Sequence, residues 1–391
     1  MSETKQINRP LRLGMVGGGV GAYIGNIHRI AARQDGAFQL VAGAFDVKPE
    51  AGHAFAATQH IDPTRSYGDY QTMVSAESAQ DKGIEVVAIC TPNFTHYPIA
   101  KAFIEAGIAV ICEKPLTATL DEALALEKLV RDSGVFMGVT YTYSGYPMVH
   151  EARAMIAAGV LGKVRSLQVE YPLEWMATAI EAEGNAQAAW RTDPAKNGRG
   201  GSIRDIGSHA YHLAGFVTGL KLESLTADLA TFVEGRALDD NAHVMMRYEG
   251  GARGLLWSSQ VALGNSNGLR LRVYGEHGSL SWFQEQPNEL IHAPLDGHTQ
   301  IIKRGAEGLC EAAQVRTRTP PGHPEGYLEA FANLYTGFAE AIHAQKQDRS
   351  PQAIAQHIPT AYDGLKGVAF VEAVVDSSEA VDQPWITPVA V

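Results

Sequence analysis

Cysteine and long apolar runs are the scarcest features of this 391-residue sequence. Only three cysteines occur, Cys90, Cys112 and Cys310, and their spacing matches neither a disulfide framework nor a cysteine metal site. No uninterrupted apolar run reaches the roughly 20 residues that a membrane-spanning helix needs. The opening residues, MSETKQINRP, are polar and lack the apolar centre of a signal peptide. We therefore expect a soluble, cytoplasmic protein that does not bind a membrane.

Basic residues are also fewer than acidic residues. The chain carries 32 Lys and Arg residues against 43 Asp and Glu residues, a net charge of −11. Nucleic acids and anionic membranes favour basic surfaces, so we expect neither as a partner. Apolar residues make up 45% of the chain and charged residues 19%, which is typical of a compact globular protein. The length is sufficient for two domains.

Short apolar strands alternate with helical segments over about the first 140 residues. The helix expected over 119–134 has a capping-box spacing, Thr119 and Glu122, at its start and Gly134 at its end. This alternation predicts βαβ units, whose strands form a parallel sheet covered on both faces. The expected strands are 11–16, 38–45, 85–90, 109–114 and 135–141, and a further helix is expected over 97–107.

The pattern changes after about residue 145. A helix is expected over 148–159, a polar loop over 174–203, and another helix beginning near Asp205. Several strands follow between about 222 and 283, with better alternation of apolar and polar residues and short glycine turns. They predict a mostly antiparallel sheet with one face in solvent.

The end of the chain completes a two-domain plan. Proline, glycine and charge predict a loop over 284–325, and two helices are expected near 325–345 and 351–376. We place the first domain at 1–141 and the second at 142–391. The closing helices can pack back on the first domain.

Residues 14–23, GMVGGGVGAY, contain a G-x-G-x-x-A pattern between a predicted strand and a predicted helix. Gly17 permits the tight turn, Gly19 lets a pyrophosphate approach the backbone, and Ala22 is small enough for close helix–strand packing. The helix N-terminus offers free N–H groups to phosphates. A glycine turn without a ligand is the alternative, but the βαβ context favours a dinucleotide site. The expected cofactor contacts in this loop are Gly17, Gly19, Val20 and Gly21.

Asp46 stands at the end of the second expected strand. A carboxylate there can accept hydrogen bonds from the ribose hydroxyls of NAD and would repel the 2′-phosphate of NADP. We therefore expect NAD rather than NADP, although nearby Lys48 softens that preference. An aspartate that only caps the helix after Pro49 is the alternative.

Two further strand ends carry polar residues, in TPNFTH (91–96) and EKP (113–115). Ligands bind outside the carboxyl ends of the strands in an open parallel sheet, so both segments should face the cofactor. Lys114 follows a nearly all-apolar strand and precedes a proline that restricts its backbone. We expect a fixed, partly desolvated ammonium here rather than a solvated surface charge. The candidate contacts are Thr91, Asn93, His96, Glu113 and Lys114.

The segment GGSIRDIGSHAYHL (200–213) carries the remaining candidate chemistry. Asp205 and His209 are four residues apart at the start of a predicted helix, so they should share a face. A carboxylate beside an imidazole fixes its tautomer and tunes its pKa, which suits a general base. A capping Asp and a core His are the alternatives. His209 and His212 lack a third ligand nearby, so we expect no metal.

In their order and spacing, the motifs GGGVGA, TPNFTH, EKP and DIGSH resemble the glucose–fructose oxidoreductase, inositol dehydrogenase and rhizopine catabolism family (Gfo/Idh/MocA). The resemblance covers the whole chain. It implies an α/β fold: an N-terminal Rossmann domain with a doubly wound parallel sheet, and a C-terminal α+β domain with a large, mostly antiparallel open sheet. That sheet often forms the interface of a homodimer or homotetramer.

The resemblance also implies roles for individual residues. Lys114 corresponds to a catalytic lysine that hydrogen-bonds the substrate hydroxyl. Asp205 and His209 correspond to a D-x-x-x-H pair in which His209 accepts the proton and Asp205 orients it. Trp190 and Arg191 resemble a loop that reaches the nicotinamide end of the cofactor. Further candidate substrate contacts are Tyr141, Tyr143, His212 and His323, with core packing or surface exposure as the alternative.

These expectations define a function. We expect an NAD(H)-dependent oxidoreductase that transfers a hydride between nicotinamide and a secondary hydroxyl or ketone of a sugar, anhydrosugar or cyclitol. Segments 174–203 and 284–325 resemble those of levoglucosan and sugar 3-dehydrogenases. The alternatives are an NAD-dependent glycosidase of the same fold and a non-catalytic dinucleotide-sensing regulator. The regulator needs the glycine loop but not the Lys, Asp and His set.

Overall fold

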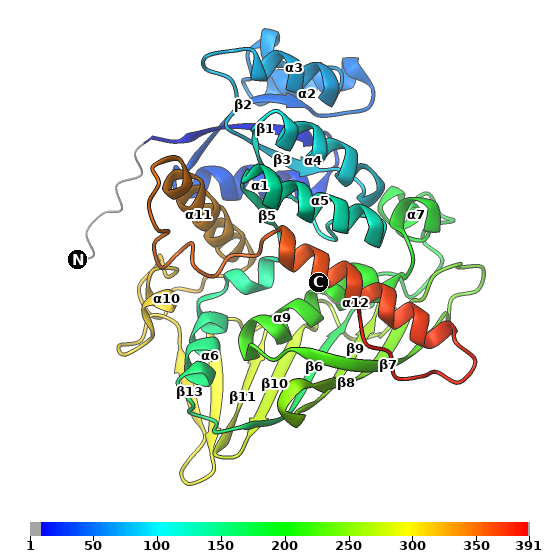
Figure 1. Cartoon of the computed structure of the whole chain (residues 1–391), viewed down its shortest axis with the longest axis vertical. Helices are drawn as coiled ribbons and strands as arrows, with labels where there is room; N and C mark the ends of the chain where they lie inside the picture. The colour runs from blue at the N-terminus through cyan, green and yellow to red at the C-terminus, as the bar shows by residue number, and fades with distance from the viewer. Residues whose placement is uncertain (1–8, 390–391) are drawn as a thin grey trace.

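The computed structural model describes residues 9–389 and contains two sheets, one above the other in Figure 1. The upper sheet is parallel, with strand order β2-β1-β3-β4-β5. Its strands are nearly continuous apolar runs and are largely buried, as expected for a sheet covered on both faces. The strands are β1 (Leu11–Gly17), β2 (Phe38–Ala44), β3 (Val86–Cys90), β4 (Ala109–Cys112) and β5 (Met137–Val139).

Helices pack on both faces of the parallel sheet. One face is covered by α1 (Tyr23–Gln34) together with α11 (Tyr327–Lys346), which comes from the far end of the chain. The other face is covered by α4 (His96–Glu105) and α5 (Leu120–Ser133), with the start of α12 (Ala361–Glu379). Two further helices, α2 (Pro49–Thr58) and α3 (Tyr70–Ser78), connect β2 to β3. The doubly wound Rossmann arrangement is thereby confirmed.

Local capping signals set the ends of α5. The Thr119 side chain accepts a hydrogen bond from the backbone N–H of Glu122 at 3.3 Å. Gly134 ends the helix in the left-handed conformation, with φ of 67°. Both ends lie where the sequence predicts them, because neither depends on distant residues.

The lower sheet has eight strands in the order β13-β12-β11-β10-β6-β9-β8-β7. Every neighbouring pair is antiparallel except β6 with β9. Helices α6 (Pro147–Ala157), α9 (Ser208–Thr218) and α12 cover its inner face. The strands are β6 (Val164–Pro172), β7 (Leu222–Ala230), β8 (Asn241–Tyr248), β9 (Arg253–Ser259), β10 (Arg270–Gly275), β11 (Gly278–Phe283), β12 (Glu289–Pro294) and β13 (Gln300–Lys303).

Three expectations for this half need correction. Strand β6, which joins β10 to β9 near the middle of the sheet, was not anticipated. The segment 284–325 is not a loop, because the β12–β13 hairpin extends the sheet and a short helix, α10 (Glu311–Gln314), follows. The last helix begins at Ala361 rather than at 351, since Thr360 and Asp363 form a capping box directly after Pro359.

The segment 174–203 is looped as expected but contains two short helices, α7 (Ala186–Arg191) and α8 (Pro194–Asn197). The side chains of Asn185 and Asp193 cap them by accepting backbone N–H groups. These caps make a polar, glycine-rich stretch an ordered part of the wall between the two sheets.

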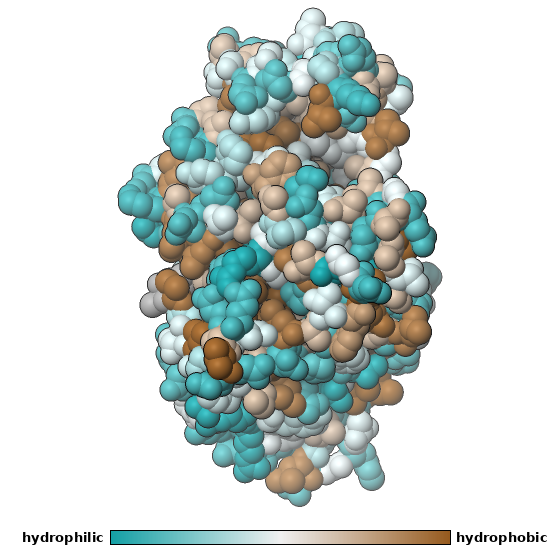
Figure 2. Space-filling model, turned by 90° about the vertical axis from the view of Figure 1, so that its right-hand side faces the viewer, coloured by the Kyte–Doolittle hydropathy of each residue, from teal (hydrophilic) through white to brown (hydrophobic). Residues whose placement is uncertain are grey.

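No helix within residues 9–389 is long and apolar enough to cross a membrane. On the face shown in Figure 2, hydrophobic and hydrophilic residues are interspersed in small groups rather than gathered in a continuous apolar band.

Candidate active site

A crevice of about 610 Å³ lies between the two halves. Its walls come from the start of α1 and the carboxyl ends of β3 and β4 on one side and from α7, the start of α9 and β6 on the other. Open α/β sheets bind ligands at this edge. The residues that line it include Thr91, Asn93, Glu113, Lys114, Tyr143, Trp190, Arg191, Asp205 and His209, all of which were candidates from the sequence.

The glycine loop turns sharply between β1 and α1. Gly17, Gly18 and Gly21 have φ of 76°, 74° and 74°, which only glycine adopts readily. A Cβ at Gly19 would lie 2.7 Å from the carbonyl oxygen of Phe45, so the loop rests against the end of β2. We assigned the close packing of helix on strand to Ala22. The structure also shows close packing at Gly25 of α1, whose Cβ would lie 2.3 Å from the Cα of Gly18, one residue beyond β1.

The first turn of α1 is suited to an anionic ligand. Its N-cap, Ala22, offers no side-chain cap, and none of the described residues in this turn is acidic. Ala22 and Tyr23 line the crevice, and Val20 on the same loop is 76% exposed. Uncapped N–H groups and the positive end of the helix dipole therefore face a space that a pyrophosphate would fill. The residues present fit a bound dinucleotide.

Asp46 lies two residues beyond the end of β2 and is half-buried. Its Oδ1 accepts a hydrogen bond from the backbone N–H of Lys48 at 2.9 Å. This contact holds the carboxylate just beyond the end of β2. Asp46 does not cap the helix after Pro49, the alternative given above, because the N-cap of α2 is Lys48 and no side chain caps it.

The candidate residues after β3 have two different roles, since some line the crevice and one braces the loops. Thr91 and Asn93 line the crevice, and the Asn93 side chain donates to Oδ1 of Asn197 at 2.9 Å, which ties this loop to α8. His96 is not among the lining residues. Its ring nitrogens lie 2.9 Å and 2.8 Å from the carbonyl oxygens of Pro115 and Thr91, and burial lowers its pKa. His96 thus braces the loops and is not placed to contact the cofactor.

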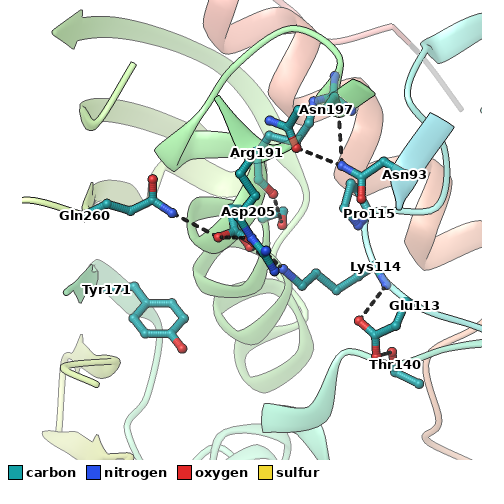
Figure 3. A network of polar contacts seen from close by, with 12 residues as sticks. Asn93, Glu113, Lys114, Pro115, Thr140, Tyr171, Arg191, Asn197, Asp205 and Gln260 are labelled. Atoms are coloured by element: carbon teal, nitrogen blue, oxygen red, sulfur yellow. Dashed lines mark hydrogen bonds and ion pairs between the residues drawn. The ribbon is translucent and has the colours of Figure 1, made fainter. Parts of the chain in front are cut away.

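Lys114 and Asp205 meet across the crevice, although they are 91 residues apart in sequence (Figure 3). The Lys114 Nζ donates to Oδ1 of Asp205 at 2.9 Å and to its carbonyl oxygen at 2.6 Å. The other carboxylate oxygen accepts from Arg191 Nε at 3.2 Å and Gln260 Nε2 at 2.9 Å. Burial alone would raise the pKa of Asp205, but Lys114 and Arg191 hold it well below its ordinary value. Asp205 is therefore ionised.

His209 does not pair with Asp205, contrary to our expectation. Residues Ile203–Gly207 form a π-helical turn before α9, so the i,i+4 geometry of an α-helix does not apply to this pair. The His209 ring is surrounded by tyrosines instead, with the Tyr143 ring centroid 4.9 Å away, and its Nδ1 is buried without a hydrogen-bond partner. Burial and the Lys114 charge hold its pKa well below 6.5. The imidazole is neutral at pH 7.

Glu113 is held by two residues that the sequence did not single out. Its Oε1 lies 3.0 Å from Nε2 of His28 and also accepts from Thr140, and His28 Nδ1 lies 2.6 Å from the hydroxyl of Tyr335. Burial would raise the pKa of Glu113, but the contacts with His28 and Thr140 keep it below its ordinary value. This buried chain connects α1 and α11 to the loop that carries Lys114.

Only some of the candidate substrate contacts lie in the crevice. Tyr143 lines the crevice, but Tyr141 and His212 lie behind the wall, stacked on each other at 4.2 Å. His323 is exposed on a surface turn outside the crevice. The lining residues we missed include Tyr171, Trp175, Asn267, Gln284 and Tyr327. Tyr171 stands near the end of the unanticipated β6, and the others belong to no recognised motif.

Arg191 packs over two tryptophans at one end of the crevice. Its guanidinium carbon lies 4.2 Å from the Trp190 ring centroid and 5.7 Å from that of Trp175. The cation is thereby fixed between Asp205 and an aromatic wall. Within residues 9–389, no group of three or more His, Cys, Asp or Glu side chains is arranged to hold a metal ion.

Comparison with known proteins agrees with this geometry. Residues 11–141 match the model of an oxidoreductase family with an NAD-binding Rossmann fold, and residues 149–281 match the GFO/IDH/MocA C-terminal domain. The chain is 40% identical over 377 residues to the uncharacterized oxidoreductase YfiI of Bacillus subtilis, and the match covers 95% of each chain. The chain belongs to the Gfo/Idh/MocA oxidoreductase family. The resemblance noted from its motifs is confirmed, and residues 11–141 form an NAD-binding Rossmann domain.

Solved structures give the same result. An inositol dehydrogenase homolog from Azotobacter vinelandii in complex with NAD+ superposes with a TM-score of 0.94 at 39% identity, covering 98% of this chain and 99% of that one. Its complex with NADH and myo-inositol gives 0.90 at 38% identity, covering 97% and 98%. A levoglucosan dehydrogenase from Pseudarthrobacter phenanthrenivorans is 28% identical over 408 residues, which span 96% of this chain and 97% of the relative.

Proposed function

We propose that this oxidoreductase transfers a hydride between NAD(H) and a secondary hydroxyl or ketone of a cyclitol, sugar or anhydrosugar. The observation that carries the proposal is the convergence of Lys114, from the Rossmann half, with Asp205 and His209, from the other half, in one crevice. Relatives named for inositol and levoglucosan support this class of substrate.

The residues of the crevice have separate roles in proton transfer and charge stabilisation during such a reaction. When bound, NAD supplies a nicotinamide ring that accepts or gives up the hydride. The neutral imidazole of His209 takes the hydroxyl proton during oxidation and returns it during reduction. Lys114 uses two of its three N–H donors on Asp205, which leaves one for the substrate oxygen. Its charge stabilises the alkoxide that develops there.

Asp205 has a different role from the one its motif implies. It contacts the ammonium of Lys114 and makes no hydrogen bond to His209 among the described contacts, so we assign it to positioning Lys114. Gln260 and Arg191 fix the opposite carboxylate oxygen. Tyr143 and Tyr171 form the aromatic wall beside His209 and exclude water from the proton acceptor.

We further propose a division of labour between residues 1–141, which bind the cofactor, and residues 142–391, which bind the substrate. Asp46 favours NAD over NADP, and the protein acts in the cytoplasm. In the alternative glycosidase the cofactor would be regenerated in each cycle, and in the alternative regulator the Lys–Asp–His set would have no use. Net NADH formation from a polyol distinguishes the dehydrogenase from both.

A second copy of the chain is the proposed partner of the eight-stranded sheet. Its outer face carries one cross-strand row of aligned residues running from β8 to β13, and four of the row are exposed apolar side chains. A homodimer or homotetramer would cover this row. Light scattering on Met245→Lys, which replaces an exposed apolar side chain of the row with a charged one, tests the assembly. The row is Met245, Leu255, Gln168, Arg272, Ser281, Ile291 and Ile301.

The test of the function is a screen of inositols, sugars and anhydrosugars followed by NADH absorbance, with NAD and NADP side by side. Lys114→Ala should bind NAD within about threefold of the wild-type affinity while kcat falls by about 10²-fold or more, because the transition-state charge loses its donor. Lys128→Ala removes an exposed lysine of α5 and should change neither quantity. Wild-type turnover by Lys114→Ala would refute the assignment.

A further inference from the structure

A second cavity, of about 840 Å³ and widely open to solvent, adjoins the crevice. The two share three lining residues, Asn267, Gln284 and Tyr327. The remaining walls of this outer cavity come mainly from the turn 285–288 between β11 and β12, from Glu289 at the start of β12, and from 324–326, just before α11. A ligand held at Lys114 and His209 therefore has room to continue into a second compartment.

The outer cavity is lined by hydrogen-bonding groups without positive charge. Among the described lining residues none is Lys, Arg or His, whereas amides and carboxylates are frequent. Carboxylate and amide oxygens accept hydrogen bonds from hydroxyl groups, and carboxylates repel anions. Glu325 is paired with buried Arg304 at 3.0 Å, but Arg304 lies behind the wall. The chemistry fits a neutral polyhydroxylated group rather than a phosphate or an acid.

Two of the lining side chains are more than nine-tenths buried and retain an unpaired oxygen. Gln284 is 8% exposed, and its Nε2 donates to the Tyr146 hydroxyl at 3.2 Å while its Oε1 has no partner. Glu325 is 5% exposed, and its Oε2 is likewise unpaired. Buried polar atoms in native proteins are almost always paired, so each of these oxygens lacks a water or ligand partner beneath the wall of the outer cavity.

A hydrogen-bond chain joins the two compartments. Tyr143 and Tyr171, which pack against the His209 ring, are hydrogen-bonded through their hydroxyls, and Tyr171 donates to Oδ1 of Asn267 at 2.6 Å. Asn267 in turn lines both the crevice and the outer cavity. The wall of the catalytic site is thus continuous with the wall of the outer cavity.

We propose that the substrate is a neutral glycoside, a ring polyol that carries a second sugar unit. The ring that reacts lies at Lys114 and His209, and the second ring lies in the outer cavity, where its hydroxyls meet the amides and carboxylates of the wall. This inference rests on the proposed oxidoreductase function and narrows its substrate class.

The experiment compares single rings with their glycosides: myo-inositol with galactinol, and glucose with gentiobiose and sucrose, each followed by NADH absorbance. At least one glycoside should have a kcat/KM tenfold or more above that of its single ring. Gln286→Trp fills the outer cavity from an exposed position and should lower this ratio at least fivefold. The matched control, Gln71→Trp on the exposed side of α3, should preserve the ratio.

The outcomes separate the two proposals. If single rings are oxidised at least as efficiently as every glycoside and Gln286→Trp leaves the ratios unchanged, the glycoside inference is overturned while the oxidoreductase function stands. If neither single rings nor glycosides yield NADH, the proposed function fails and the inference fails with it.

Discussion

Gly25→Ala tests how closely the phosphate-binding loop depends on the helix behind it. Gly25 lies in the first turn of α1, against Gly18 of the glycine loop. The added Cβ would lie 2.3 Å from the Cα and 2.6 Å from the carbonyl oxygen of Gly18. Non-bonded carbon atoms rest about 3.5–4.0 Å apart, so the loop and the helix must separate by about 1 Å or more.

The size of the effect follows from this overlap. Overpacking of this kind costs about 1–3 kcal/mol, and alanine recovers about 0.5–1 kcal/mol of helix propensity. The element that must move is backbone of the loop that would hold the pyrophosphate. If the full overpacking cost falls on cofactor binding, the Kd for NAD rises about 5- to 150-fold, since about 1.4 kcal/mol is a factor of ten.

Calorimetric titration of NAD into Gly25→Ala and the wild type measures this change, and urea unfolding measures the accompanying loss of stability. Gly215→Ala is the control, because Gly215 lies in α9 rather than α1 and a Cβ there meets no atom within 4 Å. It should bind NAD normally and gain about 0.5–1 kcal/mol of stability. A Gly25→Ala protein with wild-type affinity and stability would refute the close-packing argument.

Three other perturbations follow from the same geometry. Asp205→Asn keeps the shape of the side chain but removes the charge that positions the Lys114 ammonium. The kcat should therefore fall about 10- to 150-fold, the equivalent of about 1.5–3 kcal/mol. The Kd for NAD, measured in parallel, should change little. The neutral form of His209 is fully present above its depressed pKa and is lost only as the pH falls through that value. The pH profile of kcat/KM should therefore show no decline centred near pH 6.5. A decline centred there would contradict the assignment of His209 as the proton acceptor. Glu372→Ala leaves the guanidinium of Arg204 buried without its carboxylate partner and should cost about 3–5 kcal/mol in urea unfolding. Glu379→Ala, at an exposed ion pair, should cost no more than about 1 kcal/mol, and equal losses in the two variants would show that burial is not the cause.

Much of the upper half of the molecule was predictable from short stretches of sequence. The strands of the parallel sheet are apolar runs, and the ends of α5 follow from Thr119, Glu122 and Gly134. The glycine loop was recognisable because its conformation excludes side chains at Gly17 and Gly21. The placement of Lys114 in a partly buried position after an apolar strand was also correct.

Errors arose where local rules were applied to residues whose partners are distant. A spacing of four residues predicted that Asp205 faces His209, but the π-helical turn and the ammonium of Lys114 give the carboxylate other partners. Tyr141 and His212 were candidate substrate contacts with core packing as the alternative, and in the structure they stack behind the wall. No local signal distinguishes a tyrosine in the crevice from one behind it.

Residue type and short-range spacing were enough to establish the dinucleotide-binding half, its cofactor class and the identities of the groups that could do chemistry. They could not establish which of those groups meet. The Lys114–Asp205 contact, the position of β6 between β10 and β9, and the junction of the crevice with the outer cavity each join segments far apart in the chain. Such contacts depend on how whole sheets and helices pack, and this packing energy is spread over many side chains rather than encoded in any one stretch.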